Sequence, residues 1–166
     1  MSNFEISVNK TLAFEGGYTN DILDPGGETR FGIAKRSHPN VNIATLTIEQ
    51  AKEIYRTEYW NSLYDGISNQ EVANELFDFG VNVGRSTAVK VLQESIRYLS
   101  VGPVVIDGAF GQKTLDAVNA LEPILLLHEF RARQAYYYAN IVIRAPDASE
   151  PDKRRYLLGW LRRVVA

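Results

Sequence analysis

Apolar residues recur along most of this chain at the spacing of amphipathic helices. Phe4, Val8 and Leu12 share one face of a predicted first helix, and that face is expected to be buried. Capping boxes, in which a hydroxyl and a later Glu or Gln satisfy free backbone N–H groups, mark helix starts at Ser2-x-x-Glu5, Thr47-x-x-Gln50 and Ser68-x-x-Glu71. Further helices are predicted from Ser86 to Tyr98 after a break at Gly84, over 112–121, from Pro123 to about Asn140, and from Pro151 to about Arg163.

Residues 16–35 lack this helical periodicity. Asp24-Pro25-Gly26-Gly27 is typical of a turn, because proline fixes φ and glycine is free to take positive φ. We interpret Thr29 to Ile33 as one short strand of a small hairpin. The expected fold is therefore mainly α, a helical bundle with a small β-hairpin or irregular lobe near the N-terminus.

Composition and charge narrow the possible functions. The 166 residues are 45% hydrophobic and 23% charged, as in a soluble globular protein, and include no cysteine and two histidines. We therefore expect neither a metal nor another cofactor. The net charge of −2 argues against a nucleic-acid partner. The first residues lack the features of a secretory signal, so we expect synthesis in the cytoplasm. We also expect the protein to be a monomer.

Glu15 is the most informative charged residue. At 100° per residue it falls on the same face as Phe4, Val8 and Leu12. Partial burial and the negative end of the helix dipole would both raise its pKa and keep it protonated near neutral pH. A general acid for glycoside cleavage needs this property. The alternative is a structural Glu paired with an arginine or a backbone amide.

The segment FEGGYTNDILDPGGETRFGI, residues 14–33, resembles glycoside hydrolase family 108, a family of phage and bacterial muramidases. Its EGGY stretch and DPGGxT-x-[YF]-GI turn are both present. The resemblance continues through 51–60, 76–84 and 107–118 to GWLRRV near the end. It implies a lysozyme-like fold, with a catalytic region at 1–100 and a helical peptidoglycan-binding-like region at 101–166 packed on it as one unit.

The resemblance also implies a reaction. The expected activity is hydrolysis of the β-1,4 bond between N-acetylmuramic acid and N-acetylglucosamine, with Glu15 as catalytic acid. Similarity to the Glu…Asp…Thr spacing of other phage lysozymes nominates Asp24 and Thr29, although the gap between these two is one residue shorter here. Asp21 and Glu28 remain rivals for the second carboxylate. By the same analogy we expect inversion, in which a water attacks the sugar. Alternatively, Asp24 only caps the Pro25 turn and Thr29 is an ordinary strand residue.

Other side chains are candidates for the substrate groove. Tyr18, Glu28 and Phe31 lie near the motif, and aromatic rings pack against the apolar faces of sugars. Asp78 and Asn82 form a polar row with Glu75 beside a core stripe made of Val72, Leu76, Phe79 and Val83. For Glu75 a solvated face or a helix-buttressing network is the preferred interpretation.

The remaining expectations concern the C-terminal half and the setting. The last helix is basic and amphipathic, and we expect it to dock its apolar face on the domain, the alternative being a membrane surface. The expected partners are peptidoglycan glycan strands and, from the family, a holin or an export system that delivers the protein to the cell wall or periplasm. Two other functions stay open: a lytic transglycosylase, and a non-catalytic wall-binding or secretion-accessory protein.

Overall fold

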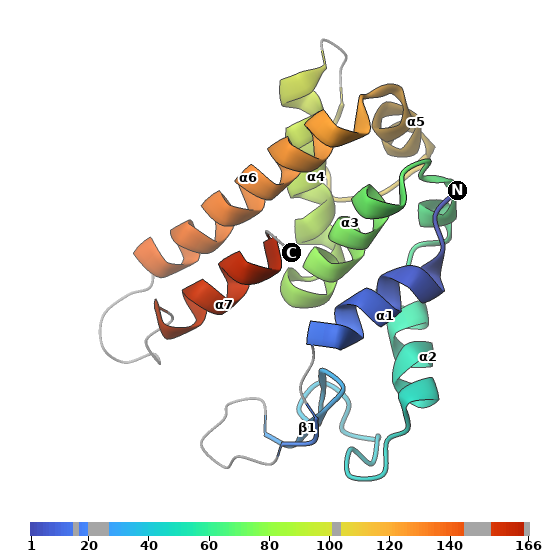
Figure 1. Ribbon diagram of the computed structural model, residues 1–166, viewed down its shortest axis with the longest axis vertical. Coiled ribbons are helices and arrows are strands. Elements are labelled where there is room, and N and C mark those ends of the chain that lie inside the picture. The colour runs from blue at the N-terminus through green and yellow to red at the C-terminus, as the bar shows by residue number, and fades with distance from the viewer. Residues whose placement is uncertain (15–16, 20–26, 101–103, 145–153, 165–166) are drawn as a thin grey trace.

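A computed structural model describes residues 1–14, 17–19, 27–100, 104–144 and 154–164. The predicted mainly α, lysozyme-like fold is confirmed: helices are joined to a two-stranded antiparallel sheet near the N-terminus (Figure 1). The elements in chain order are α1 (Phe4–Phe14), β1 (Thr29–Arg30), β2 (Ile33–Ala34), α2 (Ile48–Glu58), the short 3₁₀ helix η1 (Ser62–Gly66), α3 (Gln70–Val83), α4 (Arg85–Leu99), α5 (Gln112–Ala120), α6 (Pro123–Ile143) and α7 (Arg154–Val164).

Helix α3 is the central element of the core. It packs against α1, α4 and α6, and Figure 1 shows it enclosed by these helices. All residues from Val72 to Phe77 are buried, as are Phe79 and Gly80. The predicted stripe is confirmed for Val72, Leu76 and Phe79, which are almost completely buried. Because this helix is covered on most sides, polar residues on it are also enclosed.

One predicted capping box and one predicted proline start are confirmed. Thr47 accepts from the backbone N–H of Gln50 at 3.2 Å, and the Gln50 side chain accepts from the N–H of Thr47 at 2.9 Å. Pro123 occupies the first turn of α6, where its missing N–H costs no hydrogen bond.

The other two predicted caps are each wrong by one residue. Asn3, not Ser2, caps the start of α1, and its Oδ1 accepts from the N–H of Glu5. Asn69, not Ser68, caps α3 and accepts from two backbone N–H groups. Asparagine caps as well as serine does, so the adjacent Asn decides the start. Ser2 instead donates its hydroxyl to a distant carbonyl, that of Tyr64.

The segment Thr29 to Ile33 is not one strand of a hairpin, as predicted, but most of the hairpin itself. Thr29 pairs with Ala34 and Arg30 with Ile33, and the connection is Phe31-Gly32. Both connecting residues have positive φ, 51° and 76°, which is the requirement of a type I′ turn. A positive φ is costly for phenylalanine, and the sequence pattern gave no sign of it.

Two further turns organise the C-terminal half. Gly84, with φ of 86°, separates α3 from α4 as predicted. Gly108, with φ of 78°, lies in the turn before α5. The buried Gln93 of α4 fixes this turn: its Oε1 accepts from the N–H groups of Asp107 and Gly108, and its Nε2 donates to Asp107 Oδ1 at 2.9 Å. Hydrogen bonds from the Ala109 N–H and from Gln93 lower the pKa of Asp107.

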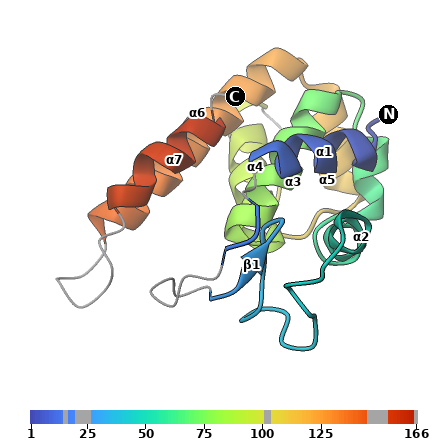
Figure 2. The same ribbon diagram turned by 60° about the horizontal axis from the view of Figure 1, so that its bottom comes forward.

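Helix α7 docks on α6, as expected for its apolar face. The two helices run side by side in both views (Figures 1 and 2). Trp160 stacks on the buried ring of Tyr138 with a centroid distance of 5.1 Å, and Val164 is buried at the end of the helix. Among the described residues, no helix has both the length and the apolar character needed to cross a membrane.

Candidate active site

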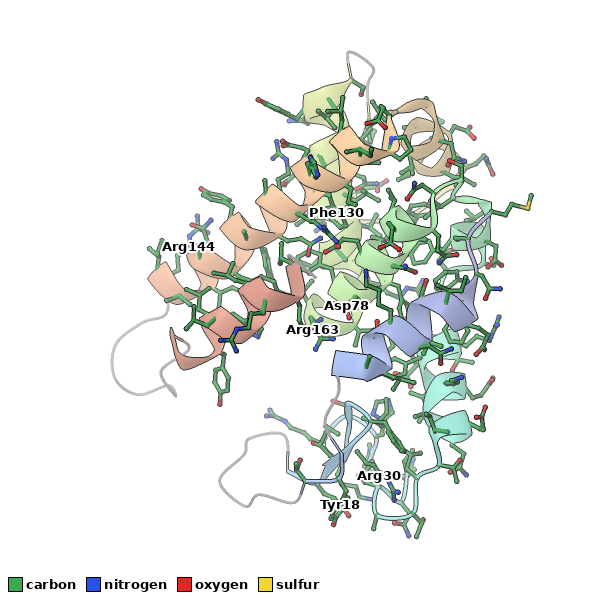
Figure 3. The ribbon with its side chains drawn as sticks, viewed as in Figure 1. Tyr18, Arg30, Asp78, Phe130, Arg144 and Arg163 are labelled. Carbon is green, nitrogen blue, oxygen red and sulfur yellow. The ribbon has the colours of Figure 1, made fainter. Side chains whose placement is uncertain are left out.

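The described candidate residues come from three parts of the fold. Tyr18, Glu28, Thr29 and Phe31 belong to the hairpin and the strand-like segment beside it, whereas Asp78 and Asn82 lie on α3. Figure 3 shows Asp78 beside Arg163 of α7, with Arg30 of the hairpin and Tyr18 of the neighbouring segment below them. Three other candidates, Glu15, Asp21 and Asp24, lie outside the described residues.

Helix α1 leads directly to the predicted general acid, since it ends at Phe14. The predicted buried face is confirmed for Phe4 and Val8, which are 3% and 0% exposed, while Leu12 is half-buried. Ser7 and Thr11 share this face and are also buried. The role of Glu15 stays a prediction, founded on its place in the sequence after this face.

The hairpin holds Thr29 on both sides. Its backbone pairs with Ala34 of β2 and exchanges two hydrogen bonds of 2.9 Å with Thr19. The Thr29 hydroxyl donates to the carbonyl of Gly27 at 3.2 Å. Thr29 is thus a strand residue, and its hydroxyl oxygen is still able to accept a hydrogen bond. The fixed backbone gives this hydroxyl a defined position.

Two other hairpin candidates interact with partners nearby. The Tyr18 hydroxyl donates to Glu28 Oε1 at 3.0 Å, and the Tyr18 side chain is 46% exposed. Phe31 is half-buried against the core, and its backbone carbonyl accepts from the Tyr55 hydroxyl at 2.9 Å. The guanidinium of Arg30 lies 5.2 Å from the centre of the Phe31 ring. These contacts support the turn, and they leave much of the Tyr18 ring in solvent.

On α3, Asp78 and Asn82 form one connected unit with α7. Arg163 binds Asp78 through two atoms, with Nη2 at 2.8 Å from Oδ1 and Nε at 3.2 Å from Oδ2. The amide of Asn82 donates to the backbone carbonyl of Asp78 at 2.8 Å and to Asp78 Oδ2 at 3.4 Å, and the residue is exposed. Asp78 is therefore neutralised by an arginine, so any role in binding substrate would be shared with Arg163.

Glu75 is buried and paired, in agreement with the buttressing interpretation. Its Oε2 accepts from Arg131 Nε of α6 at 2.8 Å, and its side chain is 8% exposed. Burial raises the pKa of Glu75, and Arg131 opposes this effect. A small hollow next to this pair is lined by Lys10, Asn74, Glu75, Asp78 and Arg163. No group of three or more possible metal ligands occurs in the parts of the chain that the structure describes.

Sequence reasoning missed the two arginines that neutralise this row. Arg163 lies in a basic stretch near the chain end, and Arg131 lies in the middle of α6, so neither is near Asp78 or Glu75 in sequence. The available signal was weak: a carboxylate on the buried side of a helix requires a counter-charge. The pattern could not show which arginine supplies it.

Comparison with known proteins agrees with this fold. A family model described as glycosyl hydrolase 108 matches residues 8–84, and one described as a predicted peptidoglycan domain matches residues 87–165. The solved structure of Brucella abortus SagA is similar, with 26% identity and a TM-score of 0.76, over 98% of this chain and 89% of SagA. None of the curated proteins matches this chain.

These matches support a class of protein, a glycoside hydrolase that acts on peptidoglycan. The N-terminal half of the chain matches glycosyl hydrolase 108, and a match to a predicted peptidoglycan domain follows it. The first match ends at Gly84 and the second begins at residue 87, so all of α4 except its first two residues lies in the second match. The predicted division into 1–100 and 101–166 stays a prediction.

Proposed function

We propose that this protein is a muramidase that hydrolyses the β-1,4 bond between N-acetylmuramic acid and N-acetylglucosamine. The match of residues 8–84 to glycosyl hydrolase 108 carries the proposal, because it spans Glu15-Gly16-Gly17-Tyr18 and the Asp24-Pro25-Gly26-Gly27 turn. In this proposal Glu15 is the general acid that gives its proton to the leaving oxygen. The buried residues that precede it on α1, such as Val8, fit an acid whose pKa is raised by an apolar surrounding.

The second step requires an activated water. We assign the base to Asp24, with Asp21 and Glu28 as the rivals. Glu28 already accepts a hydrogen bond from Tyr18 at one oxygen, which favours Asp24. The Thr29 hydroxyl donates to Gly27, so its oxygen is left to accept one hydrogen of the water while the base accepts the other. This arrangement turns an oxygen lone pair toward the sugar and supports inversion.

Substrate contacts in this proposal come from both sides of the candidate site. The exposed part of the Tyr18 ring suits the apolar face of a sugar, with Glu28 and Phe31 supporting the hairpin around it. On α3 the amide of Asn82 is able both to donate to and to accept from an N-acetyl group. Asp78 contributes as part of its pair with Arg163.

We further propose that the protein acts as a monomer on the glycan strands of the cell wall and causes lysis there. A holin or an export system would give it access to that wall, as the family resemblance suggests. No cofactor is required for the proposed chemistry, because both proton transfers use side chains.

The products of digestion test the reaction type. Purified sacculi treated with the protein should release fragments with reducing ends, and NMR of the fresh product should show the inverted α-anomer. Mass spectrometry distinguishes the alternatives. Anhydro ends would indicate a lytic transglycosylase, and unchanged sacculi would indicate a wall-binding or accessory protein. A β-anomer would refute inversion and leave hydrolysis intact.

A further inference from the structure

A polar groove lies on the peptidoglycan-domain half, between α4, α6 and the segment before α5. Glu94, Arg97 and Tyr98 of α4, Ile106, and Arg133 of α6 line it, and its volume is about 500 Å³. This size is within the range of sites that bind small molecules or short peptide segments. All five residues fall in the second family match, residues 87–165.

The groove combines an exposed ring with a fixed arginine. Tyr98 is 71% exposed, far more than a ring that serves the core. The guanidinium of Arg133 lies 5.3 Å from the centre of this ring, and its Nε donates to Glu129 at 2.6 Å. Arg133 is also 3.8 Å from Glu94. Arg133 is thus held in place by its neighbours, and it supports the ring.

Arg97 and Glu94 supply the groove with charges that are available to a ligand. Residues 94, 97 and 98 share one face of α4, because they are three and four positions apart. Arg97 is exposed and makes no ion pair with any described residue. Glu94 is 45% exposed, and among the described residues its ion pair is the 3.8 Å contact with Arg133. A ligand with both a carboxylate and an ammonium group matches this pair of charges.

Hydrogen bonds hold the turn next to one lining residue of the groove, Ile106. Ile106 is half-buried and directly precedes the Asp107-Gly108 turn, which the side chain of Gln93 fixes through hydrogen bonds of about 3 Å. A site that is preformed in this way loses less free energy to ordering when a ligand binds. Ile106 also gives the lining an apolar surface for aliphatic parts of a ligand.

We propose that this groove binds the peptide stem of peptidoglycan. The proposal deepens the proposed function, on which it rests. Stem peptides carry carboxylates and, in the diamino acid, an ammonium group, whereas neutral N-acetyl sugars carry neither. Arg97 receives a carboxylate, Glu94 receives the ammonium group, and the Tyr98 ring covers the aliphatic chain between them.

The position of the groove gives it a separate role from cleavage. The C-terminal end of α4 lies at the far end of the molecule from the hairpin (Figure 1). Peptide binding there attaches the enzyme to the wall while the candidate active site meets the glycan. Two contacts on one polymer raise the effective concentration of the enzyme at the bonds it cleaves.

The test is titration of the full chain with a synthetic stem tetrapeptide that contains a diamino acid, followed by NMR and calorimetry. We expect shifts at Tyr98 and Ile106, and an affinity lowered about tenfold or more by Arg97→Gln and by Tyr98→Ala. Both side chains are exposed, so these variants should keep the thermal stability of the wild type. Arg144→Gln, at the distant end of α6, is the matched control and should bind normally (Figure 3).

Each other outcome overturns the assignment. Absence of tetrapeptide binding, or shifts confined to other surfaces, would remove the groove as a stem site. Shifts in the groove with an N-acetylglucosamine oligomer in place of the tetrapeptide would make it a glycan site. The tetrapeptide contains no glycosidic bond. Failure of the muramidase proposal on sacculi is therefore measured independently of this binding.

Discussion

At the residue scale, the most unusual charged group that the structure describes is Glu75. It is buried in the central helix, in agreement with the structural role that the sequence pattern favoured for it. Its partner Arg131 explains how a carboxylate is tolerated there. The helix caps, in contrast, show a case in which the sequence prediction was wrong. Asn3 and Asn69 replaced the predicted serines as caps because neighbouring residues with equal capping ability cannot be separated by pattern alone.

The raised pKa of Glu75 predicts a specific pH dependence of stability. Its pKa in the folded state lies above the ordinary value of 4.5 because burial disfavours the charged form. The folded protein therefore binds the proton more tightly than the unfolded chain does. The stabilising contribution is fully present below about pH 4.5 and is lost as pH rises through the folded-state pKa.

Denaturant unfolding of the wild type and of Glu75→Gln, at a series of pH values from below about 4.5 upward, measures this change in stability. The free energy of unfolding of the wild type, relative to the variant, should decrease as pH rises. An increase instead would mean that the ion pair with Arg131 outweighs burial and that the pKa is lowered. The glutamine is of similar size, so the comparison isolates the ionisable group.

At the scale of elements, helices were predictable where periodicity and end signals agreed. The break at Gly84, the start at Pro123 and the span of α5 follow from local chemistry. The position of the hairpin was predicted correctly, but its turn was not. The reason is that the positive φ of Phe31 is set by tertiary contacts. The carbonyl of that residue is held by Tyr55 of α2, which no local pattern shows. Docking of α7 on the domain was predicted, but the ion pair between its Arg163 and Asp78 of α3 was not.

The ion pair between Asp78 and Arg163 is expected to hold α7 against α3. Both side chains are less than a fifth exposed and are joined by two hydrogen bonds. In a double-mutant cycle with Asp78→Asn and Arg163→Gln, thermal or urea unfolding should give a coupling free energy of about 1–3 kcal/mol. In such a cycle the effects of each single substitution cancel, so the coupling free energy reports the interaction between the two side chains alone. A coupling near zero would show that apolar contacts, such as that of Trp160, suffice to dock the helix.

At the scale of the whole molecule, a region that matches glycosyl hydrolase 108 packs through its helices on a region that matches a predicted peptidoglycan domain. Apolar periodicity predicted the mainly helical fold. The specific motif near Glu15 predicted the glycoside hydrolase class. It did not predict the groove at Arg97 and Tyr98, since that site depends on how α6 crosses α4. Residues that are far apart in sequence and chemically ordinary acquire a role only in the fold.

The central claim is that Glu15 gives its proton to the sugar leaving group. Its most direct test is the rate of reducing-end release from sacculi by Glu15→Gln, with folding checked by circular dichroism. We expect a loss of about 10²–10⁴-fold with an unchanged fold, and a smaller loss for Thr29→Ala, which only places the water. A Glu15→Gln protein that cleaves sacculi at the wild-type rate would contradict the account.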